Sequence, residues 1–150
     1  MNQRIKSFTG LSLPILVILA ALGAPRVFFH DLHLVDPHGT LNLLLAVVPF
    51  ILWIGFVLVS KTNKPFQALL TIGMIYGLYL GVIHLVLWVF AFDTPPVLGG
   101  NLSGMAPALQ AVLMRGFMLI SSLVTGAFTG AVTGLVGWLL HLVLYSRRQQ

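Results

Sequence analysis

The chain has 150 residues, of which 58% are apolar and only 7% charged, with a mean hydropathy of +1.00. A soluble domain carries about 25% charged residues, so this composition is typical of a membrane protein without a separate soluble domain. The net charge of +5 is explained by basic residues at the ends of membrane helices, so we expect no nucleic-acid partner. The chain has no cysteine, which excludes disulfides, thiolate metal sites and cysteine nucleophiles.

Four apolar runs are each long enough to cross a bilayer, because about 20 mostly apolar helical residues span a hydrocarbon core about 30 Å thick. We predict transmembrane helices at about 8–29, 41–60, 66–92 and 112–145. The expected fold is an all-α membrane protein with a single domain, residues 1–150, and an antiparallel four-helix bundle. The first run also resembles a cleavable signal peptide, with Arg4 and Lys6 at its start, and this alternative leaves the other helices unchanged.

The distribution of basic residues predicts the orientation of the chain. With four crossings, one side of the membrane holds three basic pairs, namely Arg4/Lys6, Lys61/Lys64 and Arg147/Arg148. The other side holds Arg26 and Arg115 with the three aspartates, Asp31, Asp36 and Asp93. Cytoplasmic loops carry the excess of Lys and Arg, so both termini are predicted to be cytoplasmic, at a face that meets anionic lipids. The pattern fits the bacterial inner (cytoplasmic) membrane best.

Prolines predict where the helices bend and begin. Pro14 is expected to kink the first helix and Pro49 the second. Asp36 followed by Pro37 resembles an N-cap and first residue, which would start the second helix there. The turn before Pro65 is short, so the second and third helices are predicted to be antiparallel neighbours.

Glycines spaced four apart give the third and fourth helices a face without side chains. These glycines are Gly73, Gly77 and Gly81 in the third helix, and Gly126, Gly130, Gly134 and Gly137 in the fourth. Such faces let helix backbones approach closely, and we predict that the two helices pack through them as a glycine zipper. A partner protein or a second copy of the chain is the alternative occupant of one face.

Equal depths in the membrane predict which glycines face each other. If Phe66 and Tyr145 mark the same depth, the helical rise places Gly73 near Gly137, Gly77 near Gly134 and Gly81 near Gly130.

Histidine gives two candidate sites. His84 shares the glycine face of the third helix and is predicted to lie near Thr125, with Thr129 and Thr133 continuing a polar row. The favoured interpretation is a neutral imidazole bonded to a hydroxyl or carbonyl, because no acidic residue is expected in any membrane core. A proton carrier is the alternative.

The second candidate is the first outer loop, where His30, His33 and His38 lie beside two aspartates and could bind zinc, copper or nickel. Their spacing matches no established metal motif, and such loops often bind nothing.

The function predicted from these features is that of a non-enzymatic accessory, assembly or scaffold subunit that acts through helix contacts and needs no cofactor. A small oligomeric transporter or channel is the first alternative, with a pathway through His84, the three threonines and Asn42. A metal-binding protein of the outer face is the second. Partners are therefore expected to be the lipid bilayer and a membrane protein or a second copy.

Overall fold

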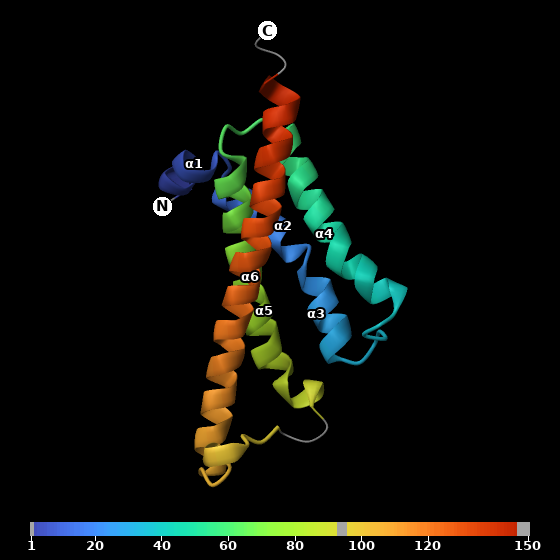
Figure 1. Cartoon of the computed structure of the whole chain (residues 1–150), viewed down its shortest axis with the longest axis vertical. Helices are drawn as coiled ribbons and strands as arrows, with labels where there is room; N and C mark the ends of the chain where they lie inside the picture. Colours follow the sequence, from blue (N-terminus) through green and yellow to red (C-terminus); the bar gives the residue numbers. More distant parts are fainter. Residues whose placement is uncertain (1, 93–95, 147–150) are drawn as a thin grey trace.

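The structure, a computed structural model, describes residues 2–92 and 96–146, and within these ranges it contains helices and no strands. The elements are α1 (Asn2–Thr9), α2 (Leu13–Ala21), α3 (Ala24–Asp31), α4 (Thr40–Val59), α5 (Pro65–Ala91), the short 3-10 helix η1 (Gly100–Leu102) and α6 (Pro107–Ser146) (Figure 1). The predicted contributions of Asp93, Arg147 and Arg148 to orientation lie outside the described residues.

Within the described part of the chain, four segments are long and apolar enough to cross a membrane. They are Leu13–Asp31, Thr40–Val59, Pro65–Ala91 and Pro107–Tyr145. This confirms the prediction of a multi-pass membrane protein with four candidate spans. The last helix begins at Pro107, five residues before the predicted start, because proline is well suited to the first turn of a helix.

The prediction of one kinked helix over residues 8–29 is wrong, because this segment is divided among α1, α2 and α3. Pro14 lies in the first turn of α2, and Pro25 lies in the first turn of α3. Proline lacks the N–H that a helix interior needs, so each proline begins a helix here. The side-chain carbonyl of Asn2 also accepts a hydrogen bond from the backbone N–H of Leu13 at 3.0 Å.

Helix α1 is bonded to the turn between α4 and α5. The Thr62 hydroxyl donates to the carbonyl of Thr9 at 3.1 Å, and the Lys64 ammonium donates to the carbonyl of Ser7. Gly10 between α1 and α2 has a φ of +77°, and a Cβ there would collide with the Thr62 side chain, so only glycine fits. The two basic segments therefore lie together, at the same end of the molecule as the end of α6 (Figure 1).

Helices α5 and α6 make the most extensive contact in the described structure, and their backbones touch at glycines. A Cβ added to Gly73 would lie 2.5 Å from the carbonyl oxygen of Gly126 and 2.5 Å from the backbone nitrogen of Gly130. A Cβ added to Gly77 would lie 2.8 Å from the carbonyl oxygen of Ser122. No side chain fits between the two helices at these positions.

The expected pairing of glycines by depth is wrong. Gly134 lies against Phe66, Gly137 against Leu69, and Gly81 against Leu119 and Ser122. The error comes from aligning the ends of the two helices, because α6 has 40 residues and α5 has 27. The part of α6 after Gly134 extends beyond the start of α5.

Helix α4 is held mainly through its second half. The indole N–H of Trp53, which is fully buried, donates to the carbonyl of Leu19 at 2.6 Å. The Tyr145 hydroxyl donates to the carbonyl of Leu58 at 3.0 Å. Helix α4 contacts α5 less extensively than α2, α3 and α6 do, and its Thr40 end diverges from α5 (Figure 1). Helices α4 and α5 are thus consecutive in the sequence, but neither is the other's most extensive contact.

Replacing Gly126 with alanine tests the backbone contact. The added methyl group would meet the carbonyl oxygen of Gly73 at 2.5 Å, so we expect Gly126→Ala to destabilise the protein by about 1–3 kcal/mol. Gly116→Ala is the matched control on the same helix, because nothing lies within 4 Å of its added Cβ. Thermal unfolding in detergent measures both variants. Equal unfolding temperatures for the two would contradict the close contact.

Candidate functional site

A cavity of about 760 Å³ lies where α3, the loop after it, α5 and α6 meet. Its apolar lining includes Val27, Leu80 and Met118. Its polar lining comes from three parts of the chain and consists of Arg26, His30, Asp31, His33, Asp36, His84, Ser121, Ser122 and Thr125. Small-molecule sites typically have volumes of about 300–1,000 Å³, with an apolar lining and a few placed polar groups, and this cavity matches that description.

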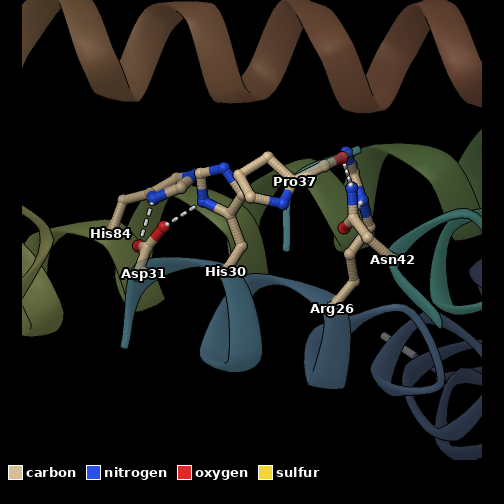
Figure 2. A network of polar contacts seen from close by, with 6 residues as sticks. All are labelled: Arg26, His30, Asp31, Pro37, Asn42 and His84. Carbon is tan, nitrogen blue, oxygen red and sulfur yellow. Dashed lines mark hydrogen bonds and ion pairs between the residues drawn. The ribbon is translucent and has the colours of Figure 1, made fainter. Parts of the chain in front are cut away.

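Asp31 is the central residue of the cavity wall. It is the last residue of α3, and its side chain is only 3% exposed. One carboxylate oxygen lies 2.6 Å from Nδ1 of His84 on α5, and the other lies 3.1 Å from Nδ1 of His30 on α3. Figure 2 shows the carboxylate joined by a dashed line to each of the two imidazole rings. Asp31 therefore links α3 to α5 inside the apolar part of the chain.

The hydrogen bonds of Asp31 determine which ring nitrogens of the two histidines remain for a ligand in the cavity. An ionised carboxylate can only accept hydrogen bonds, so both imidazoles donate to it from Nδ1. In a neutral imidazole the other ring nitrogen, Nε2, then carries a lone pair and acts as an acceptor. The side chains of His84 and His30 are 31% and 49% exposed, so a small molecule can reach them.

The expectation that His84 has no acidic neighbour is wrong. The predicted helix ended at residue 29 and left Asp31 in a loop, whereas α3 continues to Asp31 and carries it against α5. A carboxylate takes the place of the expected hydroxyl or carbonyl partner of His84. A buried carboxylate is stable only when its oxygens are bonded, and the two histidines supply both bonds.

The polar row predicted for α6 is divided between two environments. Thr125 lines the cavity with His84. The Thr133 hydroxyl is instead bonded within its own helix, to the carbonyl of Thr129 at 2.8 Å and to that of Gly130 at 3.3 Å. Neither Thr129 nor Thr133 lines the cavity, so a continuous path from His84 along all three threonines is not formed.

The three loop histidines do not form a cluster. His30 and His33 line the cavity, whereas His38 does not. Among residues 2–92 and 96–146, no three His, Asp or Glu side chains are grouped so that they could hold a metal ion. The metal hypothesis for His30, His33 and His38 therefore has no support in this part of the chain.

Asp36 also differs from its predicted role as the cap of the second helix. Its side chain accepts from the backbone N–H of His38 at 2.9 Å, and α4 begins only at Thr40, after Gly39. A short side chain such as aspartate readily bonds a backbone N–H two residues ahead, which makes a turn instead of a helix start.

A second polar group lies beside the histidine–carboxylate cluster. Nε of Arg26 donates to the side-chain oxygen of Asn42 at 3.3 Å, and the Asn42 amide donates to the carbonyl of Pro37 at 2.6 Å (Figure 2). Asn42 is 8% exposed and joins the start of α4 to α3. The sequence contained one signal that Arg26 lies beside the histidine–carboxylate cluster, because Arg26 and His30 are four residues apart and share a helix face.

No family model, curated protein or solved structure matches this chain. Its function must therefore be inferred from the site.

Replacing Asp31 with asparagine tests the central bond pair. Asparagine has the same side-chain shape as aspartate but only one oxygen, so one histidine loses its hydrogen-bond acceptor. We expect the free energy of unfolding to fall by about 1–3 kcal/mol. Asp36→Asn is the matched control, because Asp36 is exposed and bonded to a backbone N–H. Thermal unfolding measures both. A loss at position 36 as large as that at position 31 would contradict the role assigned to Asp31.

Proposed function

We propose that this multi-pass membrane protein is a non-enzymatic binding protein that holds a small polar molecule in the cavity between α3, α5 and α6. The observation that carries the proposal is the buried carboxylate of Asp31, bonded to His30 and His84 in the wall of that cavity. Ionisable residues within membrane spans are rare and typically mark the path or site of a substrate or ion. A cavity of this size with few polar groups has the character of a ligand site.

The proposed orientation places both termini in the cytoplasm and the cavity in the outer half of the cytoplasmic membrane. It is supported by α1 and the α4–α5 turn, which bring four basic residues to one end of the molecule: Arg4, Lys6, Lys61 and Lys64. Basic segments favour the cytoplasmic face and its anionic lipids. The same proposal includes an antiparallel bundle in which the glycine faces of α5 and α6 pack together.

The divergence of α4 favours a second candidate, an accessory or assembly subunit that binds another membrane helix. The first half of α4 carries large apolar side chains that the rest of the chain leaves exposed, among them Leu43, which is 62% exposed, and Leu41, which is 56% exposed. Lipid covers such a surface in a monomer, and a partner helix or a second copy of this chain can replace the lipid. This candidate differs from the first because it does not require an occupied cavity.

Single cysteines test the orientation, since the natural chain has none to give background labelling. We expect Gly104→Cys to react with a membrane-impermeant thiol reagent in intact cells, and Asn63→Cys to react only after permeabilisation. Both positions are exposed, and the added Cβ at Gly104 meets nothing within 4 Å. The reverse labelling pattern would contradict the proposed orientation.

Native mass spectrometry of the protein from its own membranes tests the binding site. We expect a bound small molecule on the natural protein and its loss in Thr125→Phe, because phenylalanine fills part of the cavity and Thr125 is not one of the residues bonded to Asp31. Val124→Phe is the matched control, because Val124 is 62% exposed and does not line the cavity. A bound molecule that persists in Thr125→Phe would contradict this site. A foreign protein at stoichiometric amount, with no small molecule, would favour the accessory subunit.

A further inference from the structure

We propose that the ligand of this cavity is a zwitterion, with its anionic group at Arg26 and its protonated amine at the cluster of His30, Asp31 and His84. This inference rests on the proposed binding function and specifies the chemical class of the ligand. Both charged ends belong to the lining of the same cavity.

The cationic end is built to bind an anion. The guanidinium of Arg26 has five N–H donors, of which the Nε donor is bonded to Asn42. That bond fixes the plane of the group, and Asn42 is itself bonded to the Pro37 carbonyl. The guanidinium is also hydrogen-bonded to the Tyr76 side chain, and its remaining N–H donors match the oxygens of a carboxylate or a phosphate.

The opposite end is built to bind a protonated amine. Both oxygens of Asp31 are bonded to Nδ1 atoms, so in the neutral form of His30 and His84 the ring nitrogen that remains for a ligand is the Nε2 acceptor. A primary ammonium has three donors for these acceptors and for the hydroxyls of Ser121 and Thr125, which line the same cavity. With both imidazoles neutral, the cluster carries the single negative charge of Asp31, which attracts a cation.

The spacing of the two ends allows one small molecule to reach both. Arg26 and His30 are one turn apart on α3, about 6 Å along the helix axis. Figure 2 shows the Arg26–Asn42 pair and the histidine–carboxylate cluster side by side above α3. A ligand with only a positive charge would be repelled by Arg26, and one with only a negative charge by Asp31. The cavity thus selects for opposite charges in one molecule.

Two sources supply this chemistry in the outer half of a membrane. One is the head group of a phospholipid with a primary amine, and the other is a free zwitterion such as an amino acid or phosphoethanolamine. A choline head group lacks N–H donors, so phosphatidylcholine provides a matrix that does not satisfy the histidine end.

The test measures thermal unfolding of the full chain in phosphatidylcholine nanodiscs. We expect phosphoethanolamine or glycine to raise the unfolding temperature, while ethanolamine alone and inorganic phosphate alone do not at equal concentration. Nanodiscs that contain phosphatidylethanolamine form the second arm. Stabilisation in that arm without an effect of the free zwitterions identifies a lipid head group, and the opposite pattern identifies a free ligand; both support the inference.

Two arginine variants make the test specific. We expect Arg26→Gln to weaken zwitterion binding by about tenfold or more, as the loss of charge-assisted hydrogen bonds predicts. Arg115→Gln is the matched control, because Arg115 stacks on Trp88 at 5.2 Å and does not line the cavity. Equal loss in both variants, or stabilisation by ethanolamine or phosphate alone that matches the zwitterions, overturns the inference.

The two proposals fail in distinguishable ways. A bound molecule that is lost in Thr125→Phe but carries a single charge, or none, overturns the zwitterion and leaves the binding site intact. The absence of any bound molecule, together with no stabilisation by any probe or lipid, overturns both.

Discussion

The backbone contact between α5 and α6 is the constraint on which the other packing depends. In a bilayer, apolar side chains gain little by leaving lipid, so association relies on close packing and polar bonds. Glycines let the two helix backbones touch, at Gly73 and Gly77 on α5 and at Gly126 and Gly130 on α6. This fixed pair presents one wall of the cavity, with His84 on α5 and Ser121 and Thr125 on α6.

Polar bonds, in contrast, position α3 and the start of α4 against that wall. Asp31 joins α3 to α5 through His84, and Asn42 joins α4 to α3 through Arg26. These hydrogen bonds are stronger in an apolar environment than in water, because an unpaired charge in an apolar environment has a high free energy. Arg26, Asp31 and His84, which hold this end of the fold together, also line the proposed ligand site, so stability and binding share residues there.

Hydrophobicity and proline were sufficient to predict the four spans, because both act locally. Pro65 begins α5 as expected, yet Pro14 and Pro25 divide the first span, since a proline can start a helix as readily as bend one. The relative depth of α5 and α6 could not be predicted, because helices of 27 and 40 residues need not end together.

The site was predicted in part. His84 stood out as an ionisable residue in an apolar helix, and Thr125 was expected beside it, where both now line the cavity. Asp31 was missed as its partner because the two residues are 53 positions apart, and their pairing depends on where α3 ends and how it packs on α5. Such a pairing is a tertiary property that no local pattern in this chain encodes.

The bond between Asp31 and His84 also constrains the order of events during synthesis. Asp31 leaves the ribosome 53 residues before His84, which is roughly 3–10 s at 5–20 residues per second. During that interval His84 is absent, and only His30 of the two imidazoles that bond Asp31 is present. Arg26 likewise precedes Asn42 by 16 residues. Asp31 therefore acquires both of its imidazole donors only after α5 has been synthesised.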